Sequence, residues 1–129
     1  MTPLSPHPKI ETISMKKIKV AQIITGLTLG GAQRVIQDII QRLPSDQFES
    51  EVISLFDYTQ ASQPHIADEL KQAGVPVHCF NFAKDGLRAY WQLWKYLRTQ
   101  KPDVIHCHLP FAAVIGTVMG RLAGIRSVI

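Results

Sequence analysis

The chain has 129 residues, of which 46% are hydrophobic and 19% are charged, so its composition is that of one globular domain with one packed core. The formal net charge of +4 comes from scattered lysines and arginines, which favours phosphate-bearing ligands or a membrane surface as partners and argues against nucleic acid. The longest apolar run, Leu109 to Gly120, is too short for a membrane-spanning helix of roughly 20 residues and no secretory signal is visible, so we expect a cytoplasmic protein, with peripheral contact at the inner face of the membrane as an additional expectation.

The first expected element is a strand over residues 18–24, where a β-branched run predicts burial. Residues 1–15 precede it with several prolines and no apolar segment, so we expect them to be a disordered leader. After a glycine-containing loop, apolar residues recur at helical spacing over residues 32–43. Gln33 and Gln37 fall on the polar side of this expected helix.

The same alternation continues along the chain. Further strands are expected over residues 51–56, 75–80, 103–107 and 126–129, and further helices over residues 63–73, 86–99 and 110–123. This alternation predicts βαβ units, and therefore an α/β, Rossmann-like, doubly wound parallel sheet over residues 16–129. The usual order of such sheets, 3-2-1-4-5, makes strands one and four neighbours. Because the fifth strand is cut short, we expect a truncated domain, produced by an artificial boundary, a gene fragment or a frameshift.

The loop between the first strand and the first helix contains Gly26, Gly30 and Gly31. In an open α/β sheet this turn binds phosphates, because glycines let the backbone approach the anion and the helix N-terminus supplies unpaired N–H groups. Thr28 stands where the dinucleotide fingerprint needs its second glycine, which argues against NAD. The alternative is a structural turn that needs positive φ at Gly30 or Gly31. This loop by itself favours the two interpretations equally.

Two histidines, His106 and His108, stand at the end of the fourth expected strand. Residues two apart in a strand share a face, so both should point the same way, with Cys107 opposite. Zinc needs at least a third protein ligand, and neither His65 nor His78 is expected nearby, so we expect no metal. The structural alternatives are a surface pair at the strand end, or one histidine in the core and one exposed. We expect His108 to face a cleft and to matter little for stability, whereas His106 would matter if it is packed more deeply.

Two helices have features that a membrane interaction could also use. The third expected helix combines Trp91 and Trp94 with a narrow basic strip. This fits a core helix with a solvated strip, or a patch at the membrane interface. The fourth expected helix contains Gly116 and Gly120, a spacing found in membrane helix dimers, but close packing of the helix on the sheet explains it without a membrane.

Three segments resemble family 4 glycosyltransferases of the GT-B fold: residues 25–35, which contain the glycine loop, residues 73–77 (Ala-Gly-Val-Pro-Val) and residues 101–110 (Lys-Pro-Asp-Val-Ile-His-Cys-His-Leu-Pro). The resemblance covers about residues 16–129. It implies the N-terminal, acceptor-binding domain of a two-domain enzyme, whose C-terminal domain binds the nucleotide-diphosphate sugar. The family often has Glu where this chain has Gln33, which removes a charge near the cleft.

The resemblance also implies roles for single residues. Gly30 and Gly31 are expected to bind the donor diphosphate. His108, with His106 as the second choice, is expected to be the catalytic histidine near the reacting sugar. The transfer is expected to retain the anomeric configuration and to use neither a metal nor another cofactor.

The expected function is therefore that of a fragment of a retaining glycosyltransferase of the hexosyltransferase type. It would move a sugar from a nucleotide-diphosphate sugar to a sugar or lipid-linked acceptor in cell-envelope or polysaccharide biosynthesis. Without a donor domain, we expect the chain alone to be inactive and to fold poorly. The alternatives are a sugar-nucleotide epimerase of the same two-domain fold and a non-catalytic binding module.

Overall fold

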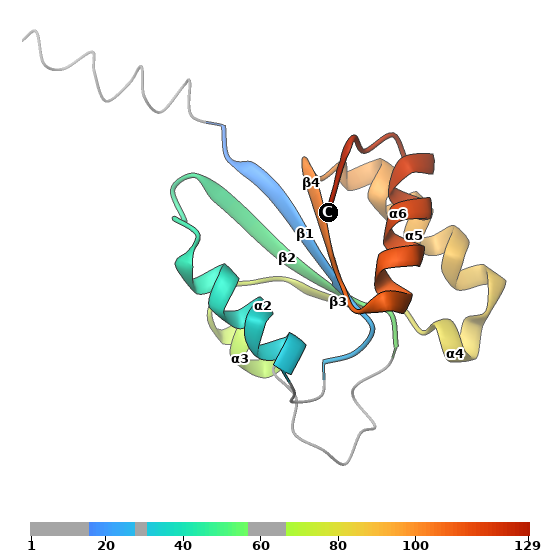
Figure 1. Ribbon diagram of the computed structural model, residues 1–129, viewed down its shortest axis with the longest axis horizontal. Helices are drawn as coiled ribbons and strands as arrows, with labels where there is room; N and C mark the ends of the chain where they lie inside the picture. Colours follow the sequence, from blue (N-terminus) through green and yellow to red (C-terminus); the bar gives the residue numbers. More distant parts are fainter. Residues whose placement is uncertain (1–15, 28–30, 57–66) are drawn as a thin grey trace, which may run out of the picture.

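The computed structural model of the chain describes residues 16–27, 31–56 and 67–129. The expected leader, Gly30 and His65 lie outside the described residues. Figure 1 shows the elements in chain order: β1 (Ile18–Ile24), α2 (Gly31–Arg42), β2 (Phe48–Ser54), α3 (Ala67–Gln72), β3 (Val77–Cys79), α4 (Phe82–Asp85), α5 (Leu87–Gln100), β4 (Val104–His108), α6 (Pro110–Leu122) and β5 (Ser127–Val128).

The strands form one parallel sheet in the order β3-β2-β1-β4-β5. β1 lies at its centre, where Gln22 is level with Val52 of β2 and with His106 of β4. A central parallel strand that is covered on both faces needs a nearly continuous apolar run, which β1 supplies. The structure therefore confirms the predicted α/β, Rossmann-like, doubly wound sheet and its strand order.

Helices cover both faces of the sheet (Figure 1). On one face, with α2 and α3, Ile24 of β1 shares a core with Ile36 of α2. On the other face, with α4, α5 and α6, Ile23 shares a core with Leu93 of α5 and Ile115 of α6. Adjacent residues of β1 therefore enter different cores, as the two-residue period of a strand requires.

Two side chains that the sequence pattern places on the polar side of α2 are buried. Gln33 and Gln37 are each 8% exposed, whereas the apolar Val35 is 49% exposed. The Gln33 amide donates a hydrogen bond to the Gly26 carbonyl (2.9 Å), and the Gln37 amide donates one to the Glu69 carboxylate (2.5 Å). The expectation is wrong because partners on neighbouring segments offset the cost of burying these amides.

The largest differences from the sequence pattern within the described residues are at β2, β3 and α4. β2 begins at Phe48 rather than at residue 51, because polar residues such as Glu49 also pair in register with β1. β3 is limited to Val77–Cys79. The short helix α4, which was not predicted, follows Asn81, whose side chain accepts a hydrogen bond from the Lys84 backbone N–H (3.0 Å) and so caps the helix.

Gly116 and Gly120 allow α6 to pack closely against β4. A Cβ on Gly116 would overlap the Sγ of Cys107, and a Cβ on Gly120 would lie 2.7 Å from the Cδ1 of Ile105. This contact confirms that close helix–sheet packing accounts for the two glycines. Within the described ranges, no helix is long and apolar enough to cross a bilayer.

Candidate functional site

The two candidate segments meet at the carboxyl edge of the sheet. β1 and β4 are neighbours, and their last residues, Ile24 and His108, are level with each other. The loop that leaves β1 leads to Gly31, the first residue of α2. After β1 the chain crosses to β2 on one side, and after β4 it crosses to β5 on the other side. The position between β1 and β4 is therefore the topological switch point, where open α/β sheets bind ligands.

The two histidines lie side by side on one face of β4. Their ring centroids are 4.2 Å apart, as the shared-face prediction requires, and Cys107 packs toward α6 on the other face. The Nε2 of His108 lies 2.7 Å from the Oε1 of Gln22 in β1. Gln22 is only 1% exposed. Sequence reasoning missed this residue, although an amide inside the most apolar strand is a signal that can be read from the sequence.

The structure buries His108 more deeply than His106, which contradicts the expectation that His108 faces a cleft and matters little for stability. His108 is 9% exposed, whereas His106 is half-buried. The expectation is wrong because the end of β4 is enclosed by its neighbours and because Gln22 holds the ring of His108 with a hydrogen bond. Loss of His108 should therefore cost stability.

Burial also sets the charge of the pair. Burial, together with the nearby His106, lowers the pKa of His108 to about 4, and burial lowers the pKa of His106. Both imidazoles are therefore neutral near pH 7. They can exchange hydrogen bonds with hydroxyl groups, but they do not offer a positive charge to a phosphate.

The described part of the chain contains no group of three or more His, Cys, Asp or Glu side chains that could hold a metal ion. His78 lies on β3, at the opposite edge of the sheet from β5, and two strands separate it from β4. The residues at the carboxyl edge therefore offer a pair of imidazoles and an amide, a set suited to hydrogen bonding with an organic substrate.

Gly31 begins α2 with a backbone φ outside the positive region, and a Cβ built on it would meet no described atom within 4 Å. The argument that this residue needs a positive φ is therefore wrong. The remaining argument for Gly31 is that a residue without a side chain lets an anion approach the backbone closely. The first turn of α2 contains no acidic residue, so nothing there opposes the attraction of its N–H groups for an anion.

The side chain of Gln33 connects α2 to the start of the glycine loop. Its amide donates to the Gly26 carbonyl, and an ionised Glu at this position could not do so because a carboxylate only accepts hydrogen bonds. Because this chain has Gln33 where the family often has Glu, the loop is held by a hydrogen bond that a Glu could not donate.

Leu109, directly after His108, has an unusual backbone conformation. Its φ of 76° and ψ of 151° lie in a region that is almost confined to glycine. Such a conformation costs about 1–3 kcal/mol and is concentrated at functional sites. It turns the chain from β4 into α6, whose first residue is Pro110. The strain thus lies at the same edge as His108.

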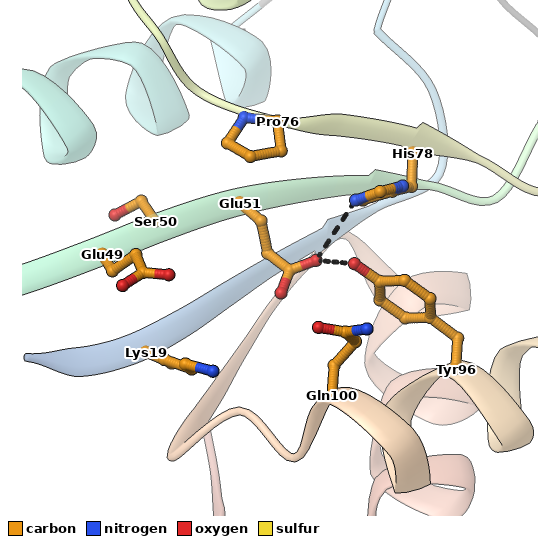
Figure 2. A pocket seen from close by; sticks show the side chains of 8 residues that line it. All are labelled: Lys19, Glu49, Ser50, Glu51, Pro76, His78, Tyr96 and Gln100. Carbon is orange, nitrogen blue, oxygen red and sulfur yellow. Dashed lines mark hydrogen bonds and ion pairs between the residues drawn. The ribbon is translucent and has the colours of Figure 1, made fainter.

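A hollow of about 320 Å³ lies beside the amino-terminal halves of β1 and β2, away from His106 and His108. Figure 2 shows its lining side chains: Lys19, Glu49, Ser50, Glu51, Pro76, His78, Tyr96 and Gln100. The Tyr96 hydroxyl donates to the Glu51 carboxylate (2.5 Å), and the Nε2 of His78 lies 3.8 Å from the same oxygen. Burial and the hydrogen bond to Glu51 raise the pKa of Tyr96. This bond attaches α5 to β2, away from the switch point.

The outer surface of α5 and α6 exposes several large apolar side chains. Five of them are 47% to 86% exposed: Leu87, Trp91, Val114, Val118 and Leu122. The Nζ of Lys95 lies 5.0 Å from the ring centroid of Trp91, and the Cζ of Arg98 lies 5.7 Å from that of Trp94. Trp94 also donates from Nε1 to the carbonyl of Leu122 (3.2 Å), which joins the two helices.

Comparison with known proteins gives a consistent result. The family model described as "Glycosyl transferase 4-like domain" matches residues 30–129. The chain is 31% identical over 120 residues to the UDP-Gal:alpha-D-GlcNAc-diphosphoundecaprenol alpha-1,3-galactosyltransferase of Escherichia coli. That match covers 88% of this chain and 29% of the enzyme.

Two solved structures share the fold. MurG from Acinetobacter baumannii matches with a TM-score of 0.64 at 16% identity, over 86% of this chain and 34% of MurG. Formyltetrahydrofolate deformylase from Burkholderia mallei matches with a TM-score of 0.50 at 14% identity, over 78% of this chain and 35% of that protein. The two names describe different proteins, so these likenesses show the fold alone. The chain spans 29% to 35% of the length of these three proteins.

Proposed function

Since the chain belongs to the glycosyl transferase 4-like domain family, we propose that it is the acceptor-binding, N-terminal domain of a retaining GT-B glycosyltransferase of the hexosyltransferase type. The enzyme would move a sugar from a nucleotide-diphosphate sugar to a lipid-linked acceptor of the cell envelope. The observation that carries this proposal is the meeting of the α2 N-terminus and His108 at the switch point of the sheet.

The N-terminus of α2 is the part of the site that suits the donor diphosphate. Gly31 places no side chain over the first N–H groups of the helix, and no acidic residue lies in the first turn. Gly30, which lies outside the described residues, is proposed to share this role. The bond between the sugar and the diphosphate breaks during transfer, so charge develops on the diphosphate oxygens, and the helix N-terminus would stabilise it.

His108 is proposed to contact the sugar that is transferred. Its neutral ring suits a hydroxyl group rather than a phosphate, and its place beside the end of β1 brings it to the same edge as Gly31. His106, at 4.2 Å between ring centroids, is the second imidazole that could take part. Neither role needs a metal ion.

The outer surface of α5 and α6 is proposed to rest on an anionic bilayer at the cytoplasmic face. A lipid-linked acceptor requires the enzyme to work at a membrane surface. Exposed Trp91 and its neighbour Lys95 have the pairing that suits lipid headgroups, with the aromatic ring at the interface and the cation near phosphate. The relative from E. coli, whose name specifies a diphosphoundecaprenol-linked acceptor, supports this placement.

The acceptor site is tested by NMR, in a titration of the isotope-labelled chain with a short-chain GlcNAc-diphosphate lipid. We expect chemical-shift changes at His106, His108 and the start of α6. Changes confined to the hollow of Figure 2, for example at Tyr96, would contradict the proposal. The hollow serves as an internal control because it lies beside the other ends of the strands.

A further inference from the structure

We propose that Gln22 is a positioning residue that fixes the tautomer of His108: the amide oxygen of Gln22 holds the Nε2–H group, and Nδ1 remains as the nitrogen that accepts a hydrogen bond from the substrate. The second half of this inference rests on the proposed function, since it specifies how His108 meets a sugar hydroxyl. The first half concerns the free chain and can be tested without a substrate.

Burial shows that Gln22 needs a partner. It stands in β1 among apolar neighbours and is 1% exposed. A buried amide costs free energy unless its polar atoms are hydrogen-bonded. The Oε1 of Gln22 is 2.7 Å from the Nε2 of His108. An apolar residue could fill the same space, so the amide is explained by what it does to the histidine.

The sheet register brings the two side chains together. Gln22 is directly level with His106, and His108 is two residues further along the same face of β4. The side chain of Gln22 therefore reaches diagonally across the strand pair, a distance that long side chains span. Because both strands are central in the sheet, the geometry is held by backbone pairing on either side.

The position of the proton follows from the chemistry of the partners. An amide oxygen only accepts, so the Nε2 of His108 must donate. A neutral imidazole has one N–H group, which leaves a lone pair on Nδ1. The lowered pKa of His108 agrees with a ring that stays neutral near pH 7. The ring can then accept from a hydroxyl group through Nδ1, and it cannot donate to that hydroxyl.

The test is ¹⁵N NMR of the histidine rings in the free chain at pH 7, with His108 assigned by its loss in His108→Gln. We expect a protonated Nε2 and an unprotonated Nδ1 in the unsubstituted chain. In Gln22→Met, which keeps the side-chain length but removes the acceptor, we expect a mixture of both tautomers. In Gln22→Glu, which keeps an acceptor, we expect Nε2–H to persist and the pKa of His108 to rise. The ring of His78, on β3, serves as the internal control.

Two results would overturn the inference. One is a protonated Nδ1 on His108 in the unsubstituted chain. The other is a tautomer that Gln22→Met leaves unchanged while circular dichroism shows that the variant is folded. For the second half of the inference, we expect Gln22→Met to weaken the affinity for UDP-galactose about tenfold, the size of one hydrogen bond, in a chimera of this chain with the E. coli relative. Failure of the unsubstituted chain to bind the acceptor would instead contradict the proposed function, so the two failures are distinguishable.

Discussion

His108 combines a low pKa with burial, and these two properties link its chemistry to the stability of the domain. Burial and the neighbouring His106 lower its pKa from 6.5 to about 4. A histidine of this kind favours the folded state only while it is neutral. The same side chain that is proposed to contact the sugar therefore also makes the fold sensitive to acid.

The first prediction concerns unfolding as a function of pH. The unfolded chain binds a proton on His108 near pH 6.5, whereas the folded chain binds it near pH 4, so the free energy of unfolding should fall as the pH falls through this window. The shift corresponds to about 3 kcal/mol at about 1.4 kcal/mol per pKa unit. Urea unfolding at pH 7.5 and 4.5 measures the loss. His108→Gln, which cannot titrate, should show a shallower dependence, and equal slopes in both proteins would contradict the prediction.

Gly31→Ala should separate the structural from the functional interpretation of the glycine loop. The Cβ has space and the backbone φ is not positive, so stability should stay level or rise by up to about 1 kcal/mol. Donor affinity should fall about tenfold or more, because the methyl group lies over the N–H groups of the first turn. Donor affinity is measured by calorimetry with UDP-galactose, in a chimera where this chain replaces the matching segment of the E. coli enzyme. Asp38→Ala, on the exposed face of α2, is the matched control. Unchanged donor affinity in Gly31→Ala would show that the glycine begins the helix but does not bind the donor.

At this scale the sequence was sufficient to find the histidines but not their partner or their relative burial. The two-residue spacing of His106 and His108 predicts their shared face from strand geometry alone. Their exposure depends on which neighbouring elements enclose the end of β4, and this is decided by tertiary packing. The same reason applies to Gln33, which is buried because the Gly26 carbonyl is within reach.

At the scale of elements, the contact of α6 with β4 fixes the strand that carries both histidines. The helix lies close because it has glycines where it meets Cys107 and Ile105. A protein interior is packed too densely to accept an added methyl group at such a place without movement.

Gly116→Ala should therefore destabilise the domain, by about 1–3 kcal/mol, even though alanine is the better helix former. The measurement is the midpoint of urea unfolding. Thr117→Ala, at the next and exposed position of α6, should leave the midpoint nearly unchanged. A Gly116→Ala midpoint equal to that of Thr117→Ala would show that the helix does not pack as closely as described.

Most elements could be predicted because apolar runs alternate with amphipathic segments, and this alternation is a local property of the sequence. The strand order also follows, since right-handed crossovers and the doubly wound pattern leave few arrangements. The start of β2 could not be predicted, because Glu49 joins the sheet only through its pairing with β1. The helix α4 was missed because its four residues are too few to show a period.

For the whole molecule, the sheet edge and the outer surface of α5 and α6 give the domain two surfaces of different chemistry. The edge bears the histidines, whereas the helix surface exposes Trp91, with Lys95 near its ring, and several leucines and valines. Large exposed apolar side chains are typical of an interaction surface when they form one patch. The proposed anionic bilayer would satisfy both the apolar and the cationic groups.

Lys95→Glu should weaken binding to vesicles that contain anionic lipid by about tenfold or more, since each charge near the surface contributes about 1 kcal/mol and the substitution reverses one. Co-sedimentation with anionic and with zwitterionic vesicles measures the effect, and added salt should reduce binding to the anionic ones. Arg34→Glu, on α2 at the opposite face of the sheet, makes the same change in net charge and should bind almost as well as the unsubstituted chain. Equal losses of vesicle binding in the two variants would contradict the prediction, because net charge alone would then explain the binding.

The central claim is that the edge between β1 and β4 is where sugar is transferred, and transfer of labelled galactose by the chimera to a GlcNAc-diphosphate lipid tests it most directly. Rates are compared at a temperature at which every variant is folded. We predict that His108→Ala lowers kcat by roughly 10²–10⁴-fold, the range for a positioned acid–base or polar group, while Tyr96→Phe, in the hollow of Figure 2, keeps nearly full activity. A folded His108→Ala chimera with the kcat of its parent would contradict the account.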